Sequence, residues 1–281
     1  MSFLDWLRVV VLGIIEGVTE WIPVSSTGHL MLLDRLWPGN AEVFTPAFTS
    51  MFNVIIQLGA ILAVITVFFH KLNPVSSYKA PDQKKNTLKL WAKILIGVIP
   101  VGIAGIFLDD LMDEYLYNEW VVAAMLILYG VIFLIVETVN KDKEPKYLKL
   151  QELPYKTALF IGLFQILALV PGTSRSGVTI LAALLLGCSR YVATEFTFFM
   201  AVPIMFGASA LKLGKYIFID KIMPTGTQWG VLIVAMAVAY GVSLLVIKWV
   251  LQFVKRHDFK GFGVYRILLG ILMILLFLLL A

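Results

Sequence analysis

The chain has 281 residues, of which 60% are hydrophobic and 15% charged, and a formal net charge of +5. Soluble globular chains carry about 25% charged residues, so the composition excludes an ordinary soluble domain and indicates an integral membrane protein. The lysines lie between the apolar runs, where they set topology, so the positive charge does not indicate a nucleic-acid partner. No run alternates as barrel strands do, and backbone in lipid must satisfy its own hydrogen bonds. We therefore expect an all-α integral membrane fold.

Six apolar segments are long enough to cross a bilayer, which takes roughly 20 helical residues. They cover residues 47–70, 91–108, 120–139, 192–212, 228–250 and 262–280. Two other segments, 4–34 and 157–188, are each broken by a cluster of Pro, Gly, Ser and Thr. Their halves are too short to cross, so we predict two re-entrant helical hairpins. No long hydrophilic stretch remains, and we expect a single membrane domain over residues 1–281.

The loops between the predicted spans differ in charge. Residues 71–93 contain six lysines and 140–156 contain five, whereas 109–119 contains five acids and no basic residue. The positive-inside rule places the two lysine-rich loops in the cytoplasm. The first hairpin then opens to the outside and the second to the cytoplasm, and each precedes three crossings.

The two halves of the chain, 1–140 and 157–281, are accordingly predicted to be repeats of inverted topology. Leu12–Glu16 aligns with Ile161–Gln165, and the turn Pro23–Gly28 aligns with Pro171–Gly177 after a gap of one residue. In membrane proteins built this way, a polar site lies where the repeats meet near the midplane.

Glu16 and Glu20 stand four residues apart on the first half-helix and therefore share one face. Two carboxylates inside an apolar stretch repel each other and are costly. A divalent cation, Mg²⁺ or Ca²⁺, would offset that repulsion, and one carboxylate could instead act as a general base. The alternative is a pair at the membrane surface without a role.

The first turn continues with hydroxyl groups and a histidine. Ser25, Ser26 and Thr27 can cap the following half-helix, which is also their purely structural interpretation. His29 lies three residues beyond Ser26 in a chain with three histidines. An imidazole at that spacing could be a general base or a nucleophile.

The second turn contains Arg175, the single charge within a long apolar run. An intramembrane arginine indicates a functional site by default. Its guanidinium, the neighbouring hydroxyls and a helix N-terminus together suit a phosphate group. The structural alternative is an ion pair from Arg175 to Glu16 or Glu20 across the repeat. The predicted substrate-binding residues are Gly172, Thr173, Ser174, Arg175 and Ser176, with Ser25 and Thr27 of the first turn.

Weaker polar signals lie within the predicted spans. Asn53 and Gln57 share a face, Glu195 follows the second turn, and Tyr265 with Arg266 begins the last span. Each could support the site or make a hydrogen bond between helices.

Glu16–Leu30 and Pro171–Gly177 resemble the two signature motifs of the undecaprenyl-diphosphatase family of bacterial bacitracin-resistance proteins. Phe52–Val64, Glu195–Ala208 and Tyr265–Gly270 are also similar to that family. The resemblance implies hydrolysis of undecaprenyl diphosphate to undecaprenyl phosphate and inorganic phosphate, which recycles the lipid carrier for peptidoglycan synthesis. It further implies the bacterial inner membrane, an active site that faces the periplasm, and Mg²⁺ or Ca²⁺.

The resemblance also implies roles for individual residues. Glu16 and Glu20 would act as metal ligands or base, Ser26 or His29 as the nucleophile, and Arg175 as the ligand of the diphosphate. From the residues alone, a transporter or flippase of an anionic lipid phosphate remains the alternative, because an inverted repeat suits alternating access. Membrane lipids are expected partners, and the apolar faces are compatible with a homo-oligomer.

Overall fold

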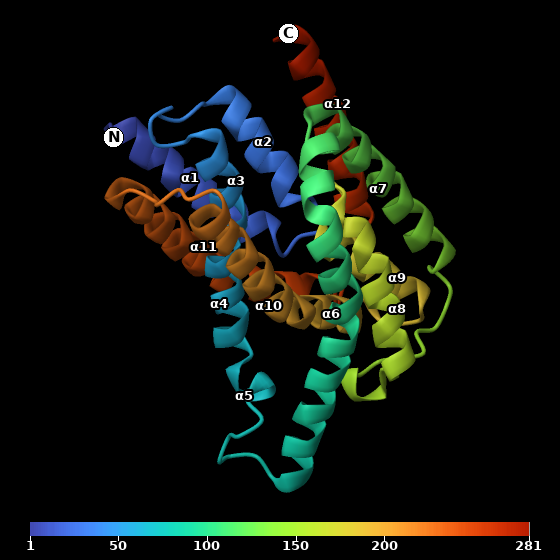
Figure 1. The fold of residues 1–281 in the computed structure, drawn as a ribbon. Helices are drawn as coiled ribbons and strands as arrows, with labels where there is room; N and C mark the ends of the chain where they lie inside the picture. The colour runs from blue at the N-terminus through green and yellow to red at the C-terminus, as the bar shows by residue number, and fades with distance from the viewer. Residues whose placement is uncertain (281) are drawn as a thin grey trace.

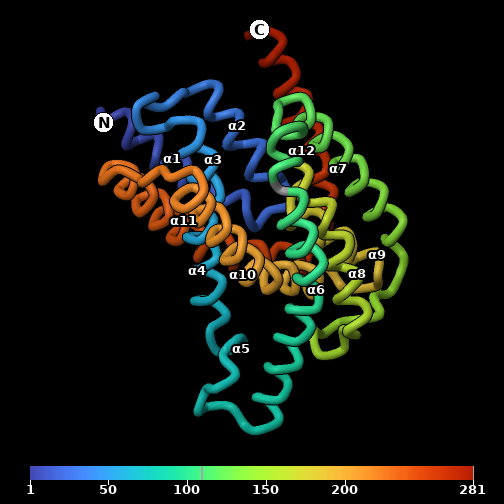
Figure 2. The backbone as a smooth tube through the Cα atoms, in the orientation of Figure 1, coloured from blue at the N-terminus to red at the C-terminus, as the bar shows by residue number. Residues whose placement is uncertain are grey.

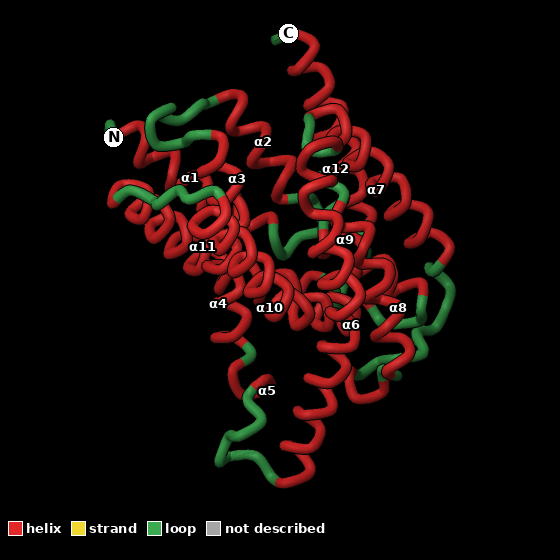
Figure 3. The backbone as a smooth tube through the Cα atoms, viewed as in Figure 1, coloured by secondary structure: helices red, strands yellow, loops and turns green. Residues whose placement is uncertain are grey.

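The computed structural model describes residues 1–280, with the side chain of Asp109 left out. Ala281, the last residue of the predicted second repeat, lies outside the described residues. The helices are α1 (Phe3–Thr19), α2 (Ser26–Leu36), α3 (Pro46–Ile55), α4 (Gln57–Val67), α5 (Phe69–Leu72), α6 (Pro81–Tyr115), α7 (Glu119–Val139), η1 (Leu150–Glu152), α8 (Tyr155–Gln165), η2 (Ile166–Leu169), α9 (Arg175–Leu185), α10 (Arg190–Gly214), η3 (Lys215–Ile219), α11 (Gly226–Phe253) and α12 (Lys260–Leu279). The all-α prediction is confirmed, since residues 1–280 contain no β-strand (Figure 3).

Within residues 1–280, six helices are long and apolar enough to cross a membrane, as the sequence predicts. They cover Pro46–Val67, Pro81–Leu108, Glu119–Val139, Arg190–Ile219, Gly226–Phe253 and Lys260–Leu279. The span over Pro46–Val67 joins α3 and α4 through Ile56, whose φ of −61° and ψ of −25° are helical.

Helix α6 is longer than predicted, with 35 residues from Pro81 to Tyr115. The loops expected over 71–93 and 109–119 are therefore wrong in their extent. Pro81 occupies the first helical turn, where a missing N–H costs nothing. The lysine-rich stretch that follows consists mostly of good helix formers, so the helix begins before the apolar residues do.

Each of the two broken segments forms two short helices joined by a turn. The first comprises α1, with 17 residues, and α2, with 11. The second comprises α8 and α9, with 11 residues each, and the 3₁₀ turn η2 between them. The breaks fall at the Pro/Gly/Ser/Thr clusters, as the sequence predicts.

The two halves of the chain pack crosswise. Helix α1 contacts α11, α8 contacts α6, and α7 contacts α12 (Figures 1 and 2). Glycines allow this close approach: a Cβ at Gly17 would lie 2.8 Å from the carbonyl oxygen of Ala239, and one at Gly162 would lie 2.0 Å from that of Gly97. The first helix of each broken segment is thus held by a span of the other half.

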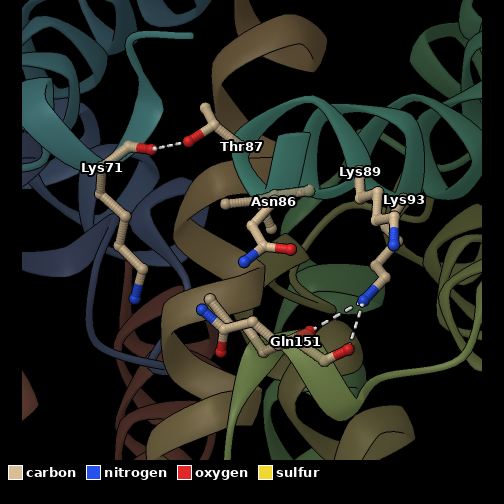
Figure 4. Close-up of a pocket in the computed structure, with 8 residues that line it drawn as sticks. Lys71, Asn86, Thr87, Lys89, Lys93 and Gln151 are labelled. Carbon is tan, nitrogen blue, oxygen red and sulfur yellow. Dashed lines mark hydrogen bonds between the residues drawn. The ribbon is translucent and has the colours of Figure 1, made fainter. Parts of the chain in front are cut away.

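The amino terminus and the end of α12 lie at one end of the molecule, and the α5–α6 connection lies at the opposite end (Figure 1). A basic pocket opens beside the first turns of α6 (Figure 4). It is lined by Lys71, Asn86, Thr87, Lys89, Leu90, Lys93, Leu150 and Gln151. None of the predicted site residues lines this pocket.

Candidate functional site

Glu20 is the residue at which the two turns meet. Arg175 donates to its Oε1 from Nη2 at 2.9 Å and from Nε at 3.3 Å. Ser26 donates from Oγ to Oε2 at 3.2 Å. The structural alternative for Arg175, an ion pair across the two halves, is therefore present with Glu20; the Glu20 side chain is buried and that of Arg175 is 9% exposed. One carboxylate links a hydroxyl of the first turn to the guanidinium of the second.

Glu16 lies one helical turn before Glu20 and is fully buried. Neither of its carboxylate oxygens has a hydrogen-bond partner among the described residues. A buried charge without a partner is strongly unfavourable, so Glu16 requires a proton or a cation beside it. No group of three or more His, Cys, Asp or Glu side chains with metal-site geometry occurs among the described residues. For a cation at this place, the protein itself therefore supplies two carboxylates, those of Glu16 and Glu20.

Ser25 and Ser174 give the two turns the same backbone shape. Their φ angles are both 72°, and their ψ angles are 102° and 116°. Each is the N-cap of the following helix, with its hydroxyl accepting from the N–H of Gly28 or Gly177. A left-handed conformation costs a non-glycine residue about 1–2 kcal/mol. Such strain is concentrated at functional sites.

Ser26 and Arg175 are consequently the first residues of α2 and α9. A helix N-terminus carries partial positive charge and free N–H groups, so it attracts anions. The two N-termini present their first side chains to the same carboxylate, that of Glu20. The arrangement can bind an anion between a hydroxyl and a guanidinium.

His29 lies on the first turn of α2, and both of its ring nitrogens have partners other than Ser26. Its Nδ1 is 2.7 Å from the carbonyl oxygen of Ser25, and its Nε2 is 2.7 Å from the hydroxyl of Tyr265. Because a carbonyl can only accept, Nδ1 carries the proton and Nε2 accepts from Tyr265. The imidazole also stacks on the Tyr265 ring, with centroids 5.7 Å apart. The side chain in contact with the Ser26 hydroxyl is thus the carboxylate of Glu20.

The remaining predicted substrate-binding residues differ in burial and in their hydrogen-bond partners. Thr173 is fully buried, and its hydroxyl has no partner among the described residues. The hydroxyl of Ser176 lies 3.3 Å from that of Ser174. Gly172 contributes its carbonyl oxygen, which accepts from Arg266. Thr27 is half-buried on the first turn of α2.

Two buried polar residues, Thr197 and Gln165, had no predicted role. The carbonyl oxygen of Thr197 accepts from Nη1 of Arg175 at 3.1 Å. The side-chain hydroxyl of Thr197 donates to the hydroxyl of Thr179. Gln165 is fully buried, and neither its amide nitrogen nor its amide oxygen has a partner among the described residues. Its alignment with Glu16 is the sequence signal that could have identified it.

Gly172 should be intolerant of a side chain. Its φ is +86°, and a Cβ would lie 2.6 Å from the carbonyl oxygen of Val122. Gly172→Ala should therefore lower the thermal unfolding midpoint in detergent, with the backbone strain alone costing about 1–2 kcal/mol. In the matched control Gly207→Ala, the new Cβ would meet nothing within 4 Å. Equal midpoints for the two variants would contradict this explanation.

Comparison with known proteins identifies close relatives over nearly the whole chain. The family described as Bacitracin resistance protein BacA matches residues 9–272. The undecaprenyl-diphosphatase of Lactiplantibacillus plantarum is 54% identical over 271 residues, which are 96% of this chain and 97% of that protein. The undecaprenyl-diphosphatase of Streptococcus mutans is 52% identical over 274 residues, which are 98% of this chain and 96% of that protein. Undecaprenyl-diphosphatase 1 of Clostridioides difficile is 52% identical over 279 residues, 99% of this chain and 98% of its own.

Proposed function

Since the chain belongs to the bacitracin resistance protein BacA family, we propose that it hydrolyses undecaprenyl diphosphate to undecaprenyl phosphate and inorganic phosphate. The observation that carries the proposal is the double contact of Glu20, with Ser26 on one oxygen and Arg175 on the other. Phosphoryl transfer depends mainly on positioning and on charge stabilisation, and this arrangement offers both. The reaction would recycle the lipid carrier for peptidoglycan synthesis.

In the proposed reaction Ser26 is the nucleophile and Glu20 the general base. Oγ of Ser26 attacks the terminal phosphorus, and its proton passes to Oε2 of Glu20. The bond from that phosphorus to the bridging oxygen breaks, and undecaprenyl phosphate leaves with the electron pair. Water then attacks the phosphoserine, and Ser26 leaves with the proton held by Glu20. One water proton stays on the inorganic phosphate, and the other goes to solvent.

Arg175 would bind the diphosphate. It lies at the N-terminus of α9, beside the hydroxyls of Ser174 and Ser176. A guanidinium matches phosphate oxygens with paired hydrogen bonds. Thr173, whose buried hydroxyl has no partner among the residues that the structure describes, is a further donor. Ser25, Thr27 and the N–H groups around Gly172 complete the proposed cradle.

We propose that Glu16 and Glu20 hold the divalent cation, Mg²⁺ or Ca²⁺. The unpartnered, fully buried oxygens of Glu16 fit a cation ligand, and Glu20 lies four residues further along the same chain segment. Mg²⁺ in phosphate sites is commonly held by one or two carboxylates together with substrate phosphates. When bound, the cation would neutralise charge that develops on the phosphate oxygens.

We also propose that the two broken segments are re-entrant hairpins in repeats of inverted topology, 1–140 and 157–281. Three observations support this: the matching left-handed serines at the start of α2 and α9, the short helices on either side of each turn, and the crosswise packing of α1 on α11 and α8 on α6. The whole chain would then form a single membrane domain with its site where the repeats meet.

The proposed location is the bacterial inner membrane, with the site open to the periplasm and the prenyl tail among membrane lipids. Lysine-rich segments 71–93 and 140–156 would face the cytoplasm. Lys212 and Lys215 pair with Asp113 and Asp110 of the acidic end of α6. The acidic end of α6 would then face the periplasm, and these ion pairs support placing the end of α10 and the start of η3 on that same side.

Cysteine labelling in intact cells should test this orientation. Cys188, the single cysteine, is buried, and burial raises the pKa of its thiol to about 12, so the native chain should not react with a maleimide at neutral pH. Glu114→Cys, at an exposed position on the acidic end of α6, should react with a membrane-impermeant maleimide. Lys143→Cys, in the lysine-rich segment, should react only after permeabilisation. The opposite pattern would overturn the orientation.

The hydrolase proposal is tested by phosphate release from undecaprenyl diphosphate. Purified protein should release inorganic phosphate with Mg²⁺ or Ca²⁺ present, and EDTA should stop the release reversibly. Activity that persists in EDTA would contradict the metal role of Glu16 and Glu20. No release with any divalent cation would instead favour the alternative, transport of an anionic lipid phosphate.

A further inference from the structure

Arg266 lies near the start of α12 and is fully buried. None of the ion pairs among the described side chains includes it. Its hydrogen bonds all go to backbone carbonyl oxygens. Burying a charge without an opposite charge costs free energy. We therefore expect the guanidinium to make contacts that a neutral side chain could not make.

The carbonyls that Arg266 binds belong to both turns of the candidate site. Nη1 donates to the carbonyl oxygen of Pro23 in the first turn at 3.2 Å. Nη2 donates to those of Gly172 at 2.9 Å and Thr173 at 3.0 Å in the second. One planar group therefore joins two segments about 150 positions apart in the sequence, as the rigid fork of arginine allows.

The guanidinium is also fixed to the span that packs on its own helix. Nε and Nη2 donate to the carbonyl oxygens of Leu126 and Met125 on α7 at 3.5 and 3.3 Å. Helices α7 and α12 contact each other extensively. Arg266 therefore connects both turns to the packed pair α7 and α12, and α12 also carries Tyr265, the partner of His29.

The bound carbonyls lie just before the reactive side chains. Pro23 is followed two residues later by Ser25, and Thr173 is followed directly by Ser174. These are the two left-handed serines that cap α2 and α9 and so place Ser26 and Arg175, the first residues of those helices. A shift of either carbonyl would move one of the two groups that contact Glu20.

We infer that Arg266 is a positioning residue that sets the distance between Ser26 and Arg175, an inference that rests on the proposed hydrolase function. Arg266→Gln should lower kcat by about 100-fold, the effect of a misplacement of about 1 Å. KM should change little, because Arg175 and the hydroxyls that would bind the diphosphate remain. Arg266→Lys should recover part of kcat, since an ammonium keeps the charge but cannot reach both turns with the same geometry.

Lys93→Met is the matched control. Lys93 is also a buried cation that donates only to backbone carbonyls, those of Leu150 and Gln151, each at 3.0 Å (Figure 4). It contacts neither turn. Its loss should lower the thermal unfolding midpoint without a loss of kcat beyond about threefold.

The decisive measurement is kcat and KM for undecaprenyl diphosphate, with the unfolding midpoint recorded for each variant. A kcat of folded Arg266→Gln within threefold of wild type would overturn the inference, and so would an equal loss of kcat in Lys93→Met. If Arg266→Gln does not fold, Arg266→Lys decides: full kcat overturns the inference, and a reduced kcat at unchanged KM supports it. Failure of the wild-type protein to release phosphate would instead refute the proposed function itself.

Discussion

Ser26→Ala should reduce phosphate release by at least about 10³-fold, because it removes the proposed nucleophile. The hydroxyl donates to Glu20 and lies at the N-terminus of α2. The alanine keeps the backbone of the helix start, and Glu20 keeps its ion pair with Arg175. We therefore expect the fold and the unfolding midpoint to change little. The measurement is kcat with undecaprenyl diphosphate at saturating divalent cation.

His29→Gln distinguishes the two candidates for the nucleophile. Neither ring nitrogen of His29 contacts Ser26, since one is engaged by the Ser25 carbonyl and the other by Tyr265. Loss of a general base typically costs about 10²–10⁴-fold, whereas loss of these supporting contacts should cost less than about 10²-fold. A larger loss in His29→Gln than in Ser26→Ala would transfer the nucleophilic or basic role to the histidine.

Arg175→Gln should lower kcat/KM by about 10³–10⁵-fold, the range found for arginines that stabilise charge in phosphoryl transfer. The variant loses the guanidinium proposed to bind the diphosphate. It also leaves Glu20 with the hydroxyl of Ser26 alone, and breaking a buried ion pair costs about 3–5 kcal/mol. Arg175→Lys should rescue little, because an ammonium cannot reproduce the paired geometry to Glu20 and the contact to the Thr197 carbonyl.

Arg190→Gln is the control that separates stability from chemistry. Arg190 donates to both oxygens of the buried Glu137 and contacts neither turn. Its loss also breaks an ion pair with a buried carboxylate, so the unfolding midpoint should fall. Catalysis by the folded fraction should persist. Similar losses of kcat/KM in Arg175→Gln and Arg190→Gln would show that Arg175 acts only through stability.

The sequence predicts much of this fold because membrane constraints are simple. Long apolar runs and few charges require helices, and the Pro/Gly/Ser/Thr clusters mark where α2 and α9 begin. The predicted extent of α6 is wrong because hydropathy marks only the apolar part of a helix. Lysine-rich turns beyond that part continue the helix when tertiary contacts and helix propensity allow.

The candidate site was predictable as a set of residues but not as a network of contacts. Spacing places Glu16 and Glu20 on one face, and the isolated charge of Arg175 marks the second turn. Which of the two carboxylates pairs with Arg175 depends on how α1 and α9 meet in space. The pairing of His29 with Tyr265, 236 positions away, likewise follows from tertiary packing.

The most direct test of a single site shared by both turns is a double-mutant cycle for Glu20 and Arg175 in phosphate release. Glu20→Gln, Arg175→Gln and the double variant are compared by kcat/KM for undecaprenyl diphosphate, with the unfolding midpoint recorded for each. Residues that act as one unit are strongly non-additive, so the double variant should lose little more than the worse single variant. Losses that multiply would contradict the account, because they would place Glu20 and Arg175 in independent roles.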